Sequence, residues 1–521
     1  MRKVRLYDTT LRDGSQAEGI SYSVMDKIRI AEELDKIGID FIEGGWPGSN
    51  PKDREFFLKI SQRKLKNSKI AAFSMTRRPN TKAEDDANLK ALLKSNAQII
   101  TIVGKTWDFH VTQVLKTTLD ENLAMIKDTV NFFVKKGLPV FYDAEHFFDA
   151  YQANQDYALK TLLSAQNAGA ELICLCDTNG GTLTPEITRI INEVKTKIKI
   201  ELGIHCHNDS GVAIANSLAA IEAGATSVQG TINGYGERCG NADLIPIIAN
   251  LKLKLKIDCI QDEKLKQLTH LSHFVSEISN MRTKNEQPFV GDSAFAHKGG
   301  MHINAVMKNP LSYEHVDPSC LGNRRRILVS ELGGKTGILL RAKDLSYDLS
   351  KNDPQTKKIL ELVQKLEHRG FQFEAAEASF QILMQKALKK YKKFFTLEGF
   401  KVVIEKRTDK KITSEAIIKL KVKGVKEHTA AEGDGPINAL DNALRKALKD
   451  FYPTLAKMHL SDFKVRVLDE KAGTAARVRV LIQSEDESDT WSTVGVSGNI
   501  IEASWQALVD SIEYKLFKDN P

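Results

Sequence analysis

The sequence lacks several features that would define its class at once. Its 521 residues include only six cysteines, and these show none of the paired spacings of a zinc ribbon. No apolar run approaches the ~18 residues that a membrane-spanning helix needs, and no block holds five or six charges of one sign. A disulfide scaffold, a membrane protein and a charged disordered chain are therefore all disfavoured.

These absences also bear on location and partners. Free thiols indicate a reducing compartment, and Cys174 and Cys176 are expected in the core. The predicted first strand follows Met1 at once and leaves no room for a signal peptide, so we expect a soluble, cytoplasmic protein. The net charge of +8 comes from dispersed lysines. It indicates a solvated surface or an anionic small substrate rather than nucleic acid or membrane as partner.

What the chain does contain is a repeated alternation of short β-branched runs and amphipathic stretches from residue 4 to about 255. Several of the helical stretches end in glycine, as helix C-termini prefer. The pattern predicts an α/β protein whose N-terminal part is a (β/α)8 TIM barrel. The expected strands are Val4–Thr10, Phe41–Trp46, Ile70–Met75, Ile99–Gly104, Val140–Glu145, Leu172–Asp177, Leu202–His207 and Ser227–Asn233.

Polar and ionisable residues follow nearly every expected strand, at the end where a TIM barrel carries its active site. Any one of them could simply mark the change from strand to loop, but the set favours a functional site. They are Arg12, Asp13, Glu43, Lys105, Glu145, Asp177, Thr178, His205, His207, Asn233, Glu237 and Asn241.

We expect three domains: the catalytic barrel at 1–265, helical linker subdomains at 266–395, and a C-terminal α+β regulatory domain at 396–521. The third contains an internal repeat, in which three strands and a helix occur twice. The first copy ends in the helix Ile437–Lys449 and the second in the helix Ile500–Tyr514. No nucleophile and base occur together there, so we interpret it as a binding module.

His205 and His207 stand two residues apart at the end of the seventh expected strand, which places both imidazoles on one face and Cys206 on the other. Alone, such a pair is more often a surface or core feature than a chelate. Together with the Asp13 carboxylate and the Asn241 amide it forms a mixed nitrogen and oxygen set. This set suits an open divalent-cation site better than a closed structural zinc site.

An open divalent cation can bind a 2-oxo acid and polarise its carbonyl toward a carbon nucleophile. Arg12 could then stabilise the oxyanion that forms. Glu145 could orient the substrate or a base, and Thr178 could hydrogen-bond the carboxylate; alternatively, both only cap loops. The sixth strand ends in Asp177 rather than lysine, which disfavours Schiff-base chemistry.

Two segments now make a family resemblance recognisable. Asp8–Gln16 (DTTLRDGSQ), with Lys27 downstream, resembles the first signature of the 2-isopropylmalate, homocitrate and citramalate synthases, and Leu202–Gly211 (LGIHCHNDSG) resembles the second. The resemblance covers essentially the whole chain, and within the family it is strongest to the long citramalate synthases. Further matching segments are Trp107–Val111, Asp143–Asp149, Gly236–Ala242, Gly300–His302, and Tyr313 ahead of Val316–Pro318.

The resemblance implies condensation of acetyl-CoA with pyruvate to (R)-citramalate in isoleucine biosynthesis, with Mg²⁺ or Mn²⁺, or alternatively Zn²⁺. It implies a homodimer with isoleucine as feedback effector. The implied residues are, for the metal, Asp13, His205, His207 and Asn241; for catalysis, Arg12, Glu145, His302 and Tyr313; for substrate, Arg12, Asp13, Gln16 and Thr178; and for regulation, Asp434, Gly435, Gly495 and Ser497. Which residue is the base stays open.

Three alternatives remain at this point. The 2-isopropylmalate synthases usually carry Ser-x-x-His after the fourth strand, whereas this chain has Gly104–Trp107 (GKTW), so a sister activity on a larger 2-oxo acid is disfavoured but open. A metal-dependent lyase would share the barrel but would not need the C-terminal repeat. A non-catalytic amino-acid sensor would not need the intact set of barrel residues.

Overall fold

A computed structural model describes residues 3–328, 338–339, 342–343, 349–350, 353–406, 408, 412–468 and 476–519. The chain divides into two compact units. The first comprises Met1–Phe295 with His315–Arg325, and the second comprises Ala296–Glu314 with Arg326–Pro521. The finer division into 1–265, 266–395 and 396–521 stays a prediction.

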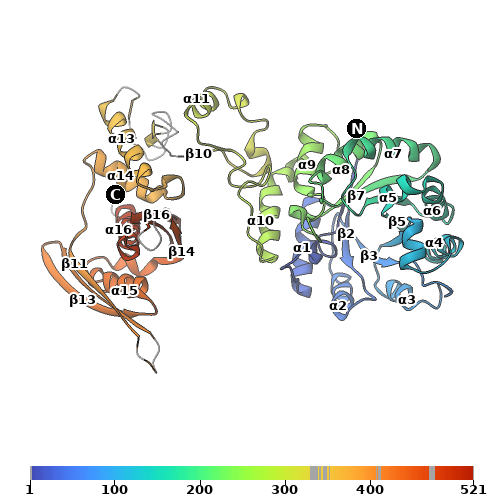
Figure 1. The fold of residues 1–521 in the computed structure, drawn as a ribbon, viewed down its shortest axis with the longest axis horizontal. Coiled ribbons are helices and arrows are strands. Elements are labelled where there is room, and N and C mark those ends of the chain that lie inside the picture. The colour runs from blue at the N-terminus through green and yellow to red at the C-terminus, as the bar shows by residue number, and fades with distance from the viewer. Residues whose placement is uncertain are drawn as a thin grey trace. The chain divides into compact units, whose positions relative to one another are not determined.

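Eight parallel strands of the first unit close into a barrel in chain order (Figure 1), which confirms the predicted TIM barrel. The closure pairs β1 with β8, with Arg5 opposite Ser227 and Asp8 opposite Gly230. The strands are β1 (Arg5–Asp8), β2 (Phe41–Gly45), β3 (Lys69–Met75), β4 (Ile99–Lys105), β5 (Val140–Glu145), β6 (Leu172–Asp177), β7 (Glu201–Cys206) and β8 (Ser227–Gly230).

The helices that follow the strands begin and end at the residues that capping chemistry favours. Ser23 and Asp26 form a reciprocal capping box at the start of α1, and Gly38 ends it in the left-handed conformation at φ 96°. The helices of this unit are α1 (Val24–Ile37), α2 (Pro51–Ile60), α3 (Ala87–Lys94), α4 (Leu119–Val134), α5 (Phe147–Ala153), α6 (Gln155–Asn167), α7 (Thr184–Lys197), α8 (Ala213–Ala223), α9 (Leu244–Leu253) and α10 (Leu268–Ile278).

Strand alternation gives the barrel two apolar layers. One face of each strand packs against the helices, and the other forms a small interior cluster that contains Tyr7, Phe41, Phe141, Cys174 and Cys176. Both cysteines are buried, as predicted. The eighth strand is shorter than predicted because a 3-10 turn with Asn233 at φ 63° follows it instead of further strand.

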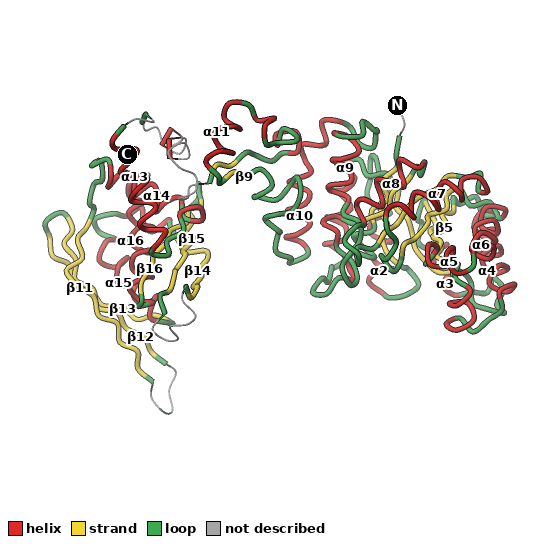
Figure 2. Tube along the Cα trace, turned by 45° about the horizontal axis from the view of Figure 1, so that its top comes forward, coloured by secondary structure: helices red, strands yellow, loops and turns green. Residues whose placement is uncertain are grey.

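The second unit contains the predicted βββα repeat (Figure 2), which confirms the C-terminal α+β fold. Its first sheet has the order β11 (Phe395–Glu405), β12 (Thr413–Val422), β13 (Val425–Gly433) and precedes α15 (Pro436–Leu448). Its second has the order β14 (His459–Val467), β15 (Val478–Glu485), β16 (Thr490–Ser497) and precedes α16 (Ile500–Asp519). All strand pairs in both sheets are antiparallel.

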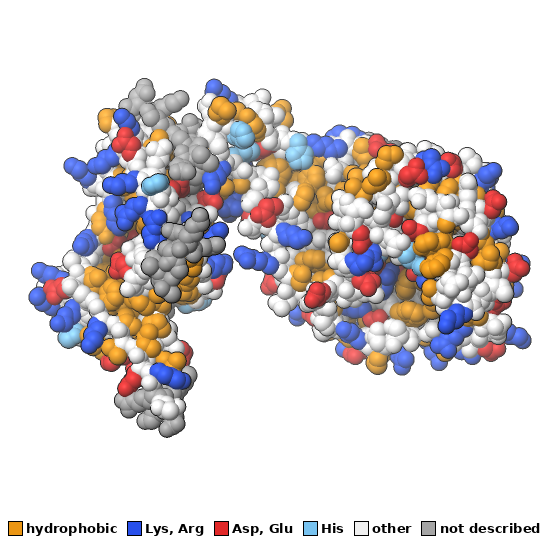
Figure 3. Space-filling model, viewed as in Figure 1, with side chains coloured by type: hydrophobic (Ala, Val, Ile, Leu, Met, Phe, Trp, Pro, Cys, Tyr) orange, Lys and Arg blue, Asp and Glu red, His pale blue; other side chains and the backbone are white. Residues whose placement is uncertain are grey.

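The rest of the second unit is mostly helical, as the sequence predicted for the linker. Its elements are β9 (Ala296–His297), α11 (Gly300–Lys308), β10 (Arg326–Ile327), α13 (Pro354–His368) and α14 (Glu377–Ala387). Among the described residues, no helix is both long enough and apolar enough to cross a bilayer. Lysine and arginine are interspersed with acidic side chains on the visible face of the first unit (Figure 3).

Candidate active site

A cavity of about 340 Å³ opens at the C-terminal ends of the barrel strands. Most of the residues in its wall are polar or charged, with apolar side chains such as Trp46, Phe73 and Val103 between them. The structure thereby brings together nine of the residues that the sequence singled out: Arg12, Asp13, Gln16, Lys105, Glu145, Thr178, His205, His207 and Glu237.

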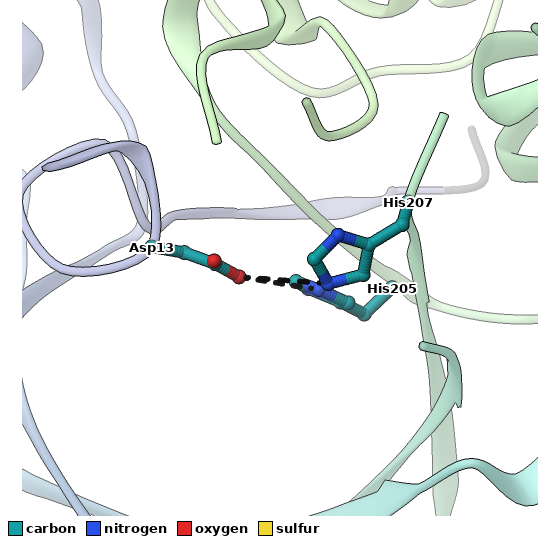
Figure 4. A group of neighbouring side chains, drawn as sticks. All are labelled: Asp13, His205 and His207. Atoms are coloured by element: carbon teal, nitrogen blue, oxygen red, sulfur yellow. Dashed lines mark ion pairs between the residues drawn. The ribbon is translucent and has the colours of Figure 1, made fainter. Parts of the chain in front are cut away.

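Three of these form a compact cluster of potential metal ligands. The ligand atoms of Asp13, His205 and His207 all lie within 4.8 Å of one another. Figure 4 shows the carboxylate turned toward both imidazoles, with its Oδ2 3.4 Å from Nε2 of His205 and 4.0 Å from Nε2 of His207. Adjacent ligand atoms around a small divalent cation stand about 3 Å apart, so the three atoms converge on one point at a somewhat wider spacing than in a coordination shell.

The local strand geometry explains why both rings meet Asp13. His205 points into the barrel, His207 follows directly after the strand, and Cys206 faces the outer apolar layer. This is the alternation predicted from the sequence. Asp13 comes shortly after β1, which pairs with β8 where the barrel closes, and it directly precedes the short helical turn Gly14–Gln16. The closure of the barrel therefore brings its carboxylate to the two rings.

Electrostatics keeps these three groups in the forms that bind a cation. Burial lowers the pKa of His205, and burial together with the neighbouring ring lowers the pKa of His207 to about 4, so both imidazoles are neutral at pH 7. Burial alone would raise the pKa of Asp13, but the adjacent Arg12 guanidinium brings it below its usual value. The cluster therefore offers two neutral nitrogen atoms and one carboxylate.

Asn241 lies beside this cluster. Its backbone bridges to that of His207, and its side chain is 2% exposed. Among the residues that the structure describes, the Asn241 amide makes no well-aligned hydrogen bond, although it lies near enough to the Asp13 carboxylate to help lower the pKa of that group. A Cβ on Gly236 would come within 2.9 Å of the amide nitrogen, so glycine is needed to leave this space. A buried amide whose polar atoms are this poorly bonded fits a ligand of a divalent cation.

Arg12 is held at the edge of the cavity by three contacts. Its Nε–H donates to Oε2 of Glu43 over 2.7 Å, its NH1 lies 3.5 Å from Oδ2 of Asp13, and its guanidinium lies 4.1 Å from the centre of the Phe73 ring. The sequence placed Glu43 at the rim without giving it a role. The structure shows that it anchors Arg12 and also accepts hydrogen bonds from Tyr7 and Thr9.

Glu145 and Thr178 line the same cavity with distinct partners. The Glu145 carboxylate forms an ion pair with Lys105, and its backbone carbonyl accepts a hydrogen bond from Thr106 at 2.6 Å. The Thr178 hydroxyl accepts the backbone N–H of His146 at 2.9 Å, which leaves its own hydrogen able to turn toward the cavity. Both residues line the cavity, and their roles toward substrate or base stay predictions.

His302 and Tyr313 belong to the second unit and lie against each other. Their ring centres are 4.1 Å apart with the planes inclined by 28°. Tyr313 is 48% exposed and the adjacent Met301 is 81% exposed. The pair is thus preassembled on an open surface of α11 and the following turn. Its catalytic role stays a prediction.

The four predicted regulatory residues occupy matching junctions of the two repeats. Asp434 and Gly435 lie between β13 and α15, while Gly495 and Ser497 lie at the end of β16 before α16. A Cβ on Gly495 would stand 2.0 Å from the Ala503 carbonyl oxygen, so this glycine lets the strand pack closely on the helix. Their regulatory role stays a prediction.

Two buried residues at the site were missed by the sequence reasoning, Asp143 and Gln229. Both face the barrel interior close to His205. Asp143 stands two residues before Glu145, so strand alternation already placed it on the inner face. Gln229 lies on the inner face of the eighth strand, and this position in the sequence already indicated that its side chain points into the barrel.

Comparison with known proteins agrees with this architecture. The family profile described as HMGL-like matches residues 3–275, a homocitrate synthase post-HMGL domain-like profile matches 289–370, and the LeuA allosteric (dimerisation) domain matches 374–516. The chain is 56% identical to an (R)-citramalate synthase of Geobacter sulfurreducens over 99% of this chain and 98% of that protein.

Two further relatives extend the match. The chain is 53% identical to the (R)-citramalate synthase of Aquifex aeolicus, over 99% of this chain and 98% of that protein. It is 52% identical to the (R)-citramalate synthase of Synechocystis sp., over 98% of this chain and 96% of that protein. The chain is thus an HMGL-like TIM-barrel enzyme with a LeuA-type C-terminal domain, and it belongs to the (R)-citramalate synthase family.

Proposed function

We propose that this protein condenses acetyl-CoA with pyruvate and water to give (R)-citramalate and CoA in isoleucine biosynthesis. The observation that carries the proposal is the meeting of Asp13, His205 and His207 in the barrel mouth, with Arg12 held beside them. The names of relatives that match along nearly the whole chain support this choice of substrates.

In this proposal Asp13, His205, His207 and Asn241 hold Mg²⁺ or Mn²⁺, with Zn²⁺ as an alternative. When bound, a divalent cation would polarise the carbonyl of a 2-oxo acid. Arg12 stabilises the alkoxide that forms at the former carbonyl oxygen. The Thr178 hydroxyl donates to the pyruvate carboxylate, and Gln16 contacts the substrate from the same wall.

A base removes a proton from the acetyl-CoA methyl group, and the resulting enolate carbon attacks the pyruvate C2 atom. The alkoxide then takes up a proton to give citramalyl-CoA. Water cleaves the thioester, which releases a carboxylate and the CoA thiol. His302, Tyr313 and Glu145 are the candidates for the proton transfers.

We further propose that the C-terminal domain forms a homodimer and binds isoleucine as feedback effector near Asp434, Gly435, Gly495 and Ser497. The match to the LeuA allosteric (dimerisation) domain supports the dimer. Chromatography with light scattering would measure its mass. A cytoplasmic location remains part of the same proposal.

A panel of 2-oxo acids tests the substrate. Release of free CoA from acetyl-CoA would be followed with pyruvate, 2-oxobutyrate, 2-oxoisovalerate and 2-oxoglutarate, each with and without isoleucine or leucine. We expect the highest kcat/KM with pyruvate, (R)-citramalate on chiral chromatography, and inhibition by isoleucine. The pyruvate reaction is contradicted if 2-oxoisovalerate or 2-oxoglutarate is preferred, because the protein would then be a sister synthase.

A further inference from the structure

The two histidines among the candidate metal ligands, His205 and His207, differ in the contacts that orient their rings. Nδ1 of His205 lies 3.1 Å from Oε1 of Gln229. Nδ1 of His207 is also buried, but it has no hydrogen-bond partner among the described residues. Both rings nonetheless turn Nε2 toward Asp13. A specific contact therefore fixes one ring, while the other is placed by the backbone and packing.

Gln229 is in register with His205 on the adjacent parallel strand, β8 against β7. Its side-chain Nε2–H donates to Oδ1 of Asp143, which reaches across the interior from β5, over 2.9 Å. Gln229 is 1% exposed and Asp143 is 3% exposed, so water does not compete for these groups. Asp143, Gln229 and His205 therefore form a continuous hydrogen-bonded chain that ends at the candidate metal ligands.

The chemistry of the donors decides which way this line is polarised. Burial raises the pKa of Asp143 to about 7, so above that pH it is a carboxylate that only accepts hydrogen bonds and fixes the NH₂ end of the Gln229 amide toward itself. The carbonyl end then faces His205, and because a carbonyl also only accepts, Nδ1 of His205 must carry the hydrogen. The Nε2 lone pair is left pointing toward Asp13, which is the tautomer that a metal ligand needs.

We propose that Gln229, held by Asp143, is a positioning residue that fixes the tautomer and ring orientation of the metal ligand His205. This rests on the proposed metal site. The residue that hydrogen-bonds the free ring nitrogen of a metal-bound histidine usually raises metal affinity by roughly 10- to 100-fold. A purely structural role would affect stability but leave the tautomer and the affinity unchanged.

Binding of Mn²⁺ to the metal-stripped protein, measured by the electron paramagnetic resonance of the free ion, tests the affinity. We expect Gln229→Leu to weaken binding by about 10- to 100-fold. Ser74→Ala is the matched control, because Ser74 is also buried on a barrel strand and its hydroxyl has no partner among the described residues. It should bind Mn²⁺ like the unmodified protein. Asp13→Asn identifies the signal that belongs to this site.

The histidine tautomer is the second readout and needs no metal. With ¹⁵N-labelled histidine rings, the unmodified protein should show an Nδ1-protonated, neutral His205, and Gln229→Leu should lose this state. If Gln229→Leu does not fold, Gln229→Met keeps the volume and removes the same hydrogen bonds.

The outcomes separate the two proposals. If the unmodified protein and Asp13→Asn bind Mn²⁺ equally, the proposed metal site itself is wrong and the role of Gln229 fails with it. If the site binds Mn²⁺ but Gln229→Leu and Gln229→Met bind it as tightly as Ser74→Ala, with an unchanged tautomer, only the role of Gln229 is overturned.

Discussion

The Arg12 guanidinium is bound by Glu43 through one edge, Nε to Oε2 at 2.7 Å, while its NH1 faces Oδ2 of Asp13 at 3.5 Å. Glu43 is entirely buried and accepts hydrogen bonds from two further side chains. The anchored edge restricts the rotation of the guanidinium. Its charge is thereby held beside the metal cluster before any substrate arrives.

Replacement of Arg12 should mainly affect turnover. We expect Arg12→Ala to lower kcat by about 100- to 1000-fold, because one oxyanion-stabilising donor is lost. Arg12→Lys should recover little of this, since an ammonium cannot bind Glu43 with one edge and face the substrate with the other. Steady-state CoA release measures both. Arg189→Ala, on the exposed surface of α7, is the control, and near-normal turnover in Arg12→Ala would remove Arg12 from the mechanism.

Removal of divalent cations should abolish activity reversibly. After dialysis against a chelator we expect no CoA release, and addition of Mg²⁺ or Mn²⁺ should restore it. His207→Ala should need far more metal for the same rate, because one neutral nitrogen ligand is gone. His270→Ala, an exposed histidine on α10, should behave like the unmodified protein. Full activity in the chelated protein would contradict a metal-dependent mechanism.

Lys27 is a structural residue although it accompanies the first signature segment. Its buried ammonium pairs with Asp53 and donates to the Gly44 carbonyl oxygen at 3.1 Å. Lys27→Met should lower the stability of the barrel by about 3–5 kcal/mol, because the Asp53 carboxylate loses its cation in a buried place. Calorimetry or urea unfolding measures this. Adding Asp53→Asn should restore part of the loss, and equal instability of the double variant would refute the explanation.

Glu513 should make the C-terminal domain less stable as pH rises. Burial raises its pKa to about 7 although Tyr391 donates a hydrogen bond to it, and its Oε2 has no partner within the described part of the chain. The folded state holds this proton more tightly than the unfolded state. The contribution of protonated Glu513 to the free energy of unfolding is therefore complete below pH 4.5, the ordinary pKa of glutamate, and is lost as pH rises through 7.

The corresponding variant is Glu513→Gln. We expect it to raise stability by roughly 1–3 kcal/mol at pH 8 and to change little at pH 4.5, since the amide mimics the protonated acid. Melting temperatures across this pH range measure the difference. Glu487→Gln, whose side chain is 80% exposed, should be neutral at both values. If Glu513→Gln raised stability equally at both pH values, titration of Glu513 would not be the cause of the effect.

Strand positions were predictable to within a few residues because apolar periodicity is a local property. The fifth and sixth strands occur at the predicted residues, Val140–Glu145 and Leu172–Asp177. The eighth strand was predicted three residues too long, because the β-branched residues Thr231 and Ile232 were weighted above the turn dipeptide Asn233-Gly234, where the left-handed turn occurs. Tertiary contacts decide that turn: Ser272 and Gln287 both donate hydrogen bonds to the Asn233 amide oxygen.

The sequence by itself determined the barrel, the repeated C-terminal module and the candidate ligands at the strand ends, since strand period and parallel topology place such residues on one rim. Only the tertiary structure decided how they are held. The anchoring of Arg12 by Glu43 spans 31 residues and the contact of Gln229 with Asp143 spans 86. Such pairs have no local signature, because closing the barrel brings them together.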